Sequence, residues 1–190
     1  MADTRVKAQT TTFNAVVSAC EKGGAWLLAL QLLRSMAEAR VERNTITHNA
    51  AISSCAKGGA WRSGLGLVRM MQEERLERDA ITYSAAISTC EQSGLWEVAF
   101  CLLCEMVEGR LERNARAYNS AISTCETGGA WEQALHALRE MATIRVETNT
   151  INFNAAVSAC EKCGAWKPAL RLWNEMVEHH VERDTITFSA

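Results

Sequence analysis

Hydrophobic and polar positions along this chain follow a helical period. In one segment, apolar side chains recur at i, i+3, i+4 and i+7, which places a single stripe along a helix. This stripe consists of Phe13, Val16, Val17 and Cys20. A glycine pair follows and favours the left-handed geometry that ends a helix. A second stripe of helical spacing then runs through Trp26, Ala29, Leu30, Leu33 and Met36. The pattern predicts two amphipathic helices joined by a tight turn.

The same pattern returns every 35 residues, in four columns that keep one register. The aromatic or histidine column is Phe13, His48, Tyr83, Tyr118, Phe153 and Phe188. Cysteine, tryptophan and methionine form three further columns, which begin at Cys20, Trp26 and Met36. Such self-similarity is typical of a repeat protein. We predict five full repeats, at 10–44, 45–79, 80–114, 115–149 and 150–184, with 1–9 as the tail of a preceding repeat and 185–190 as the start of a truncated sixth.

A single helical hairpin cannot bury both of its stripes, so neighbouring hairpins must stack. The predicted fold is all-α: a right-handed α-solenoid whose concave face is lined by the first helices of the repeats. The single proline, Pro168, falls in the first turn of a second helix, where its missing N–H is harmless. Neither end shows a polar capping repeat, so we expect exposed apolar surface and self-association through the ends.

Composition narrows the function classes. The chain has 190 residues, 48% of them hydrophobic, and a formal charge of −2. It has no run of eighteen apolar residues and no apolar segment near its N-terminus, so neither membrane insertion nor secretion is expected. A sequence pI near 6.1 gives no overall attraction to a polyanion. Any nucleic-acid partner must therefore be held by local contacts.

Candidate chemistry other than binding finds little support. We interpret the cysteine column as small buried apolar groups, and the tryptophan and methionine columns as core, with Trp173 as a large core substitution. Two CxxC spacings, at Cys101–Cys104 and Cys160–Cys163, lie on non-adjacent repeats, so no metal site is predicted. His180 and Glu182 resemble the start of a zinc deaminase signature, but no PCxxC follows. We predict no catalytic residue, no enzyme activity and no cofactor.

The segment TITHNAAISSCAKGGAWRSGLGLVRMMQEERLERD, residues 45–79, resembles the pentatricopeptide repeat family, and the resemblance covers essentially the whole chain. Tetratricopeptide repeats are the competing family, but their period is 34 residues. One departure is that the proline usual before the final residue is replaced, which is expected to loosen the turn between repeats. The replacements are Arg43, Arg78, Arg113, Thr148 and Arg183.

This resemblance implies binding of single-stranded RNA, with one base read per repeat. The reading pair is the residue after the aromatic column and the last residue of the same repeat. The pairs are Asn14 with Asn44, Asn49 with Asp79, Ser84 with Asn114, Asn119 with Asn149, and Asn154 with Asp184. An Asn amide both donates and accepts, a Ser leaves room for a purine, and an ionised Asp suits the ring N–H of uracil. By resemblance, the predicted word is 5′-(C/U)UA(C/U)U-3′.

Two more columns fit an RNA track by the same resemblance. The second residue of each repeat is expected to sandwich bases; Ile46, Ile81, Arg116 and Ile151 fit this role, whereas Thr11 fits poorly. The end of the first helix is expected to contact phosphate through Lys22, Lys57 and Lys162. Gln92 and Thr127 occupy the other two repeats, so phosphate attraction should be uneven.

Two alternatives remain open at this stage. Asn and Asp at the repeat ends are also good helix N-caps, which explains their column but not the Asn or Ser inside the first helix. The array is also consistent with a protein-interaction or architectural scaffold inside a larger ribonucleoprotein, with the base code unused. For the RNA-binding hypothesis, the family resemblance implies a mitochondrial or plastid role in RNA processing, stability, editing or translation.

Overall fold

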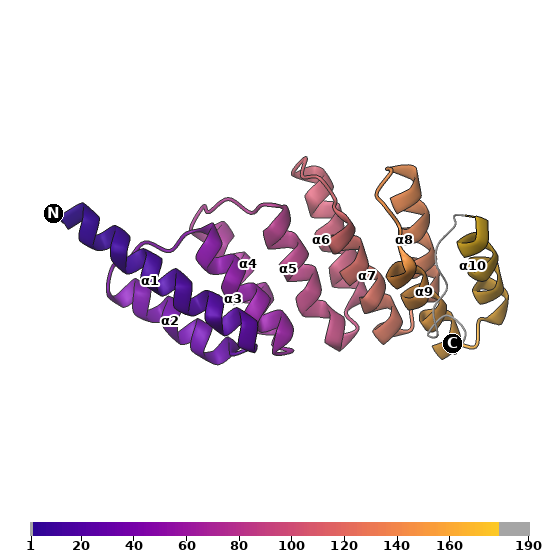
Figure 1. Ribbon diagram of the computed structural model, residues 1–190, viewed down its shortest axis with the longest axis horizontal. Coiled ribbons are helices and arrows are strands. Elements are labelled where there is room, and N and C mark those ends of the chain that lie inside the picture. The colour runs from indigo at the N-terminus through magenta and orange to yellow at the C-terminus, as the bar shows by residue number, and fades with distance from the viewer. Residues whose placement is uncertain (1, 179–190) are drawn as a thin grey trace. The chain divides into compact units, whose positions relative to one another are not determined.

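The computed structural model describes residues 2–178, and across this range all regular structure is helical (Figure 1). Ten α-helices and one short 3₁₀ helix follow one another, with no strand between residues 2 and 178. The predicted all-α solenoid of helical hairpins is confirmed. Residues 185–190 and Asp184, for which the sequence predicts a further repeat and a base contact, lie outside the described residues.

Each repeat supplies a first and a second helix. The first helices are α1 (Ala2–Gly23), α3 (Thr45–Lys57), α5 (Ala80–Cys90, followed by η1, Glu91–Ser93), α7 (Ala115–Gly128) and α9 (Thr150–Lys162). The second helices are α2 (Trp26–Glu38), α4 (Trp61–Glu73), α6 (Trp96–Glu108), α8 (Trp131–Thr143) and α10 (Trp166–Glu178). Helix α1 is longer than the others because residues 2–9 continue it, whereas the matching segment 37–44 contains a turn.

The chain forms two compact units, residues 1–89 and residues 90–190. In the first unit, α3 packs against α1, α2 and α4. In the second unit, α9 packs against α7, α8 and α10. Within each unit, a hairpin therefore stacks on the next one mainly through the first helices, as the two stripes require. None of the helices in the described part of the chain is long and apolar enough to cross a membrane.

The methionine and cysteine columns form the core. The five column methionines have no exposed surface, and the five column cysteines are at most 4% exposed. These methionines are Met36, Met71, Met106, Met141 and Met176. The interpretation of the tryptophan column as core is wrong, because the tryptophans open the second helices at the edge of the stack. Trp26, Trp61, Trp96 and Trp131 are half-buried, as is Trp173, and Trp166 is 63% exposed.

The glycine pair between the two helices serves two purposes. Its second member takes the predicted left-handed conformation, with φ of 67° at Gly59 and 68° at Gly129. At Gly58 and Gly128, its first member allows a close approach that the sequence did not reveal. A Cβ on Gly128 would lie 2.5 Å from the carbonyl oxygen of Gly94 and 2.8 Å from Trp96 Cδ1. The preceding turn and its tryptophan therefore pack directly against this glycine.

The second helices end in a motif that uses arginine in place of glycine. Arg40, Arg75, Arg110 and Arg145 have φ between 54° and 58°. The next residue then donates its N–H back to the column methionine, as Leu76 does to the Met71 carbonyl at 2.9 Å. These bonds satisfy carbonyls at the helix end. They fix the direction in which the chain enters the following first helix.

Candidate nucleic-acid interface

The last residue of each described repeat caps the first helix of the next. Asn44, Asn114 and Asn149 are N-caps whose side-chain oxygens accept from the backbone N–H three residues on, at 3.0, 2.9 and 3.2 Å. Asp79 Oδ1 accepts from Thr82 N in the same way, at 2.8 Å. The capping role is therefore present at all four of these positions in residues 2–178. Capping does not by itself explain the other members of the predicted pairs, the Asn and Ser residues inside the first helices.

Three of the predicted pairs are brought together by a third side chain. The Thr47 hydroxyl donates to Asn14 Oδ1 at 2.5 Å and lies 2.9 Å from Asn44 Oδ1. Similar contacts join two other sets, and we call each set a polar trio. The three trios are Asn14–Asn44–Thr47, Asn49–Asp79–Thr82 and Asn119–Asn149–Asn152.

Sequence reasoning missed the third member of each trio. It is the third residue of the following repeat, and this column reads Thr12, Thr47, Thr82, Ala117, Asn152 and Thr187. The signal was a polar residue that recurs at the repeat interval, in five of the six positions of the column. Thr47 and Thr82 are fully buried and Asn152 is 1% exposed. A buried polar side chain of this kind needs hydrogen-bond partners, which the trio supplies.

In the trio at Asn49, the two predicted reading side chains also contact each other directly. Asn49 Nδ2 donates to Asp79 Oδ1 at 3.2 Å, while Asn49 Oδ1 accepts from the Thr82 hydroxyl at 2.7 Å. Burial works against ionisation of Asp79, but hydrogen bonds from Thr82 and Asn49 outweigh it and hold its pKa below the usual value. The Asp79 carboxylate is therefore ionised at neutral pH.

The reading positions inside the first helices are largely covered. Asn49 and Asn154 are each 8% exposed and Ser84 is 1% exposed, whereas Asn14 and Asn119 are half-buried. The Ser84 hydroxyl donates to the Ala80 carbonyl at 2.7 Å, a local bond within its own helix. Among the predicted reading residues within 2–178, Ser84 thus has the least accessible surface.

The predicted sandwiching positions are, by contrast, open to solvent. Ile46, Ile81 and Ile151 are 65%, 58% and 64% exposed, although the residue that follows each of them in the helix is buried. Arg116, in the same column, is exposed too. Large aliphatic side chains left in water at a fixed interval are available for an apolar or aromatic partner.

The predicted phosphate-contacting lysines are all exposed, at Lys22, Lys57 and Lys162. Lys162 Nζ lies 3.3 Å from Glu126 Oε1 on the preceding first helix. Glu126 Oε1 also accepts from the Ser158 hydroxyl at 3.0 Å. An anionic ligand would have to compete with Glu126 for this lysine, so the positive charge of the track is partly neutralised.

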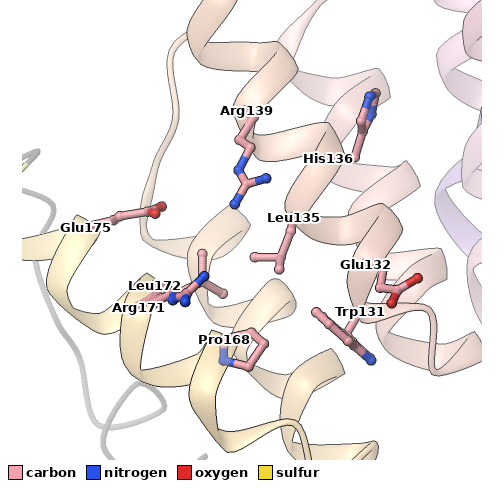
Figure 2. Close-up of a pocket in the computed structure, with 9 residues that line it drawn as sticks. All are labelled: Trp131, Glu132, Leu135, His136, Arg139, Pro168, Arg171, Leu172 and Glu175. Carbon is pink, nitrogen blue, oxygen red and sulfur yellow. The ribbon is translucent and has the colours of Figure 1, made fainter.

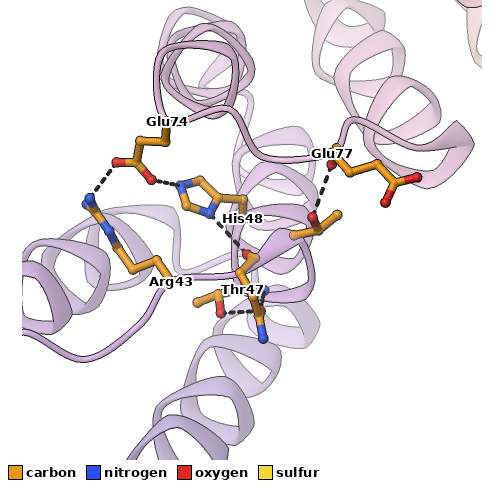
Figure 3. Close-up of polar contacts among 7 residues, drawn as sticks. Arg43, Thr47, His48, Glu74 and Glu77 are labelled. Atoms are coloured by element: carbon orange, nitrogen blue, oxygen red, sulfur yellow. Dashed lines mark hydrogen bonds and ion pairs between the residues drawn. The ribbon is translucent and has the colours of Figure 1, made fainter. Parts of the chain in front are cut away.

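His48, in the aromatic column, contacts the backbone of the Asn44 cap. Its Nδ1 lies 3.1 Å from the Asn44 carbonyl and its Nε2 lies 3.8 Å from Glu74 Oε2 (Figure 3). Burial lowers the pKa of His48, although the Asn44 carbonyl and Glu74 oppose the shift. Glu74 is also paired with Arg43, which occupies the position of the missing proline.

A second such ion pair joins Arg113 to Glu140. In both cases, an arginine near the end of one repeat pairs with a glutamate of the next: Glu74 directly follows α4, and Glu140 lies in α8. The loosening of the turn that we expect from the loss of proline is therefore opposed at these two positions, because an ion pair links the neighbouring repeats there.

A groove of about 340 Å³ lies between α8 and α10 (Figure 2). Its walls carry Arg139 and Arg171 as well as Glu132 and Glu175, and none of the predicted site residues lines it. Within the described residues, no cluster of three or more His, Cys, Asp or Glu side chains could hold a metal ion.

Stacked 35-residue hairpins with a repeated polar trio define the class of this protein: a helical repeat protein. The chain belongs to the pentatricopeptide repeat family. The family model described as "PPR repeat" matches residues 46–76, 81–111 and 151–181, and the "Pentatricopeptide repeat domain" matches residues 1–58. No curated protein matches the sequence.

Solved structures share the fold. The pentatricopeptide repeat protein PPR10 from maize superposes with a TM-score of 0.73 at 24% identity, over 93% of this chain and 25% of that one. The chain thus spans about a quarter of the length of PPR10. The PPR domain of Arabidopsis thaliana protein-only RNase P 1, solved in complex with tRNA, gives a TM-score of 0.79 at 14% identity and covers 94% of both chains. PPR10 in complex with an 18-nt psaJ RNA element gives 0.74 at 19% identity, over 94% of this chain and 25% of that one.

Proposed function

We propose that this chain is a sequence-preferring, single-stranded RNA-binding module that reads one base per repeat. The observation that carries the proposal is the set of three isoleucines, Ile46, Ile81 and Ile151, each more than half exposed. They stand three residues before Asn49, Ser84 and Asn154, which are predicted to read bases. An exposed aliphatic side chain beside a polar reading group is the combination that a stacked and hydrogen-bonded base requires.

The polar trios leave hydrogen-bonding capacity for a base. A primary amide has two N–H donors and two acceptor lone pairs. Asn49 uses one donor on Asp79 and one lone pair on Thr82. One donor and one acceptor remain, and they can meet the edge of a pyrimidine. The predicted word remains 5′-(C/U)UA(C/U)U-3′.

RNA as the partner is supported by solved relatives, since PPR10 and the PPR domain of protein-only RNase P 1 were both crystallised in complex with RNA. By family resemblance, the proposal extends to mitochondrial or plastid transcripts and to their processing, stability, editing or translation. Other ribonucleoprotein subunits and self-association through the ends are further proposed partners.

The test is binding of a 5′-UUAUU-3′ segment, placed between flanks that do not match the word, measured by fluorescence anisotropy. Stacking and edge contacts contribute roughly 1–3 kcal/mol per base, much of which is offset by ordering the strand, so we expect weak binding. Changing the central A to C should weaken binding to the wild type by about fivefold or more. The Ser84→Asn variant should reverse this preference. Equal affinity for both RNAs, or an unchanged preference in Ser84→Asn, would contradict the base code.

The low exposure of Ser84, 1%, favours a second candidate function, an architectural scaffold with an unused code. A scaffold should bind neither RNA above the level of an unrelated sequence. It should also show no difference between wild type and Ser84→Asn. The same titrations therefore separate the two functions.

A further inference from the structure

We infer that the third residue of each repeat is a positioning residue for base recognition by the repeat before it. Thr82 would act through Asn49, Thr47 through Asn14 and Asn152 through Asn119. The inference rests on the proposed function and deepens it, because it adds a third determinant to each predicted reading pair. The residue need not touch the base; it fixes which way the amide of the reading residue points.

The geometry at Thr82 shows how this orientation is imposed. Its hydroxyl lies 2.7 Å from Asn49 Oδ1 and 2.9 Å from Asp79 Oδ1, and it accepts from Asp79 N at 3.3 Å. Asn49 Nδ2 meanwhile donates to Asp79 Oδ1 at 3.2 Å. A hydroxyl has a single proton, which it shares between the two oxygens. The three side chains therefore form one connected arrangement.

Turning the Asn49 amide over would break this arrangement. Its oxygen would then face the ionised Asp79 carboxylate, and its nitrogen would face Thr82. Two acceptors in contact without a proton between them are unfavourable in a buried site. Asp79 and Thr82 together hold the amide oxygen on one side and the nitrogen on the other. The remaining donor and acceptor of Asn49 then point in fixed directions, which a base can distinguish.

The trio at Asn119 reaches the same orientation with different chemistry. Here Asn152 Nδ2 donates to Asn119 Oδ1, and Asn152 Oδ1 accepts from the backbone N–H of Asn149 at 2.9 Å. The backbone bond fixes the Asn152 amide, which in turn fixes the amide of Asn119. In all three trios, the oxygen of the reading residue accepts a hydrogen bond from the third residue of the next repeat.

The sequence pairs these positions consistently along the chain. Each Asn at a reading position is followed 33 residues later by Thr or Asn. The exception is Ser84, whose partner position holds Ala117, a residue without a side-chain donor or acceptor. A Ser hydroxyl has a single polar atom, so it has no oxygen and nitrogen that could exchange places, and it needs no partner to fix its orientation. An amide does need one, and the sequence places such a residue 33 positions after every amide in the column.

Two substitutions at one position test the inference. Thr82→Val keeps the shape of the side chain and removes its hydroxyl, while the Asp79 cap on the backbone N–H of Thr82 stays available. Thr82→Ser keeps the hydroxyl and is the matched control. Binding is measured to 5′-UUAUU-3′ and to RNAs with C or A at the second position. We expect wild type and Thr82→Ser to prefer U, and Thr82→Val to lose about fivefold or more of this preference.

The effect must be local to support a positioning role. Preference for A at the third base should be unchanged in Thr82→Val, and Thr47→Val should alter preference at the first base alone. Thermal unfolding checks each variant, and Thr47→Val carries the test if Thr82→Val does not fold. A Val variant that keeps full preference, or one that weakens all RNAs equally, would overturn the inference while leaving the proposed function standing. A wild-type protein without base preference would overturn both.

Discussion

The Asn and Asp side chains at the repeat ends can cap a helix and meet a base at the same time. Capping uses one oxygen of each: Asp79 Oδ1 and Asn44 Oδ1 accept from backbone N–H groups. The second polar atom of each side chain, an oxygen in Asp and an amide nitrogen in Asn, is not needed for the cap. These two atoms differ in chemistry, since one accepts and the other donates. The cap therefore holds the residue still and leaves its distinguishing atom for recognition.

His48 predicts a pH dependence that belongs to a single residue. It is fully buried, and burial lowers its pKa below 6.5, so the folded protein holds the ring neutral. The unfolded chain takes up this proton near pH 6.5. The stability that His48 contributes is thus complete above pH 6.5 and is lost as the pH falls through the lowered folded pKa. The slope in this window is at most about 1.4 kcal/mol per pH unit.

Urea unfolding at pH 7.5 and at pH 5.5 measures this dependence, and His48→Phe is the matched variant because Phe13 and Phe153 occupy the same column. Wild type should lose more unfolding free energy between the two pH values than His48→Phe does. Equal losses in the two proteins would show that Glu74 and the Asn44 carbonyl stabilise the charged ring and compensate for its burial.

At the scale of elements, the glycine column at the end of the first helices shows where close packing decides stability. Gly23, Gly58 and Gly128 share this column, but their surroundings differ. A Cβ on Gly58 would lie 2.3 Å from Trp26 Cδ1, whereas a Cβ on Gly23 would meet nothing within 4 Å. The same residue is therefore required in one repeat and replaceable in another.

Gly128→Ala should destabilise the protein by about 1–3 kcal/mol, because the new methyl group meets the Gly94 carbonyl and the preceding turn must shift. Gly23→Ala is the control at the same column position, and it should be neutral or stabilising by up to about 1 kcal/mol. Chemical unfolding of the two variants beside wild type measures both. Similar destabilisation of both variants would mean that glycine flexibility, and not the close contact, sets the cost.

Periodicity predicted much of this element-level structure, and its failures have physical reasons. The Met and Cys columns follow one stripe and are buried as expected. The Trp column keeps the same interval but is only half-buried or exposed. A repeat interval alone does not tell how deeply a side chain is buried. Val16 is 41% exposed although it belongs to the predicted stripe, while Ala51 in the same column is fully buried. Burial there depends on a neighbouring repeat, which a single helical pattern does not contain.

At the scale of the whole molecule, the reading pairs followed from family resemblance, but the trios could not. Thr47 and Asn14 are 33 residues apart, and their contact exists only once two hairpins stack. The exposure of the Ile column and the pairing of Lys162 with Glu126 depend on the same stacking. Stacking thus determines both the orientation of the reading residues and the charge available to RNA phosphates.

The charge of this track gives the last prediction. The net charge is −2, so phosphate attraction depends on local lysines, and Glu126 neutralises Lys162 at 3.3 Å. Glu126→Gln should free this lysine, tighten binding of the UUAUU segment severalfold at low salt, and steepen the log–log salt dependence by about 0.7. Glu73→Gln is the matched control, because it changes the net charge equally but breaks a pair with Arg69 on a second helix. Equal tightening in both variants would assign the effect to overall charge, and no change in either would exclude Lys162 as a phosphate contact.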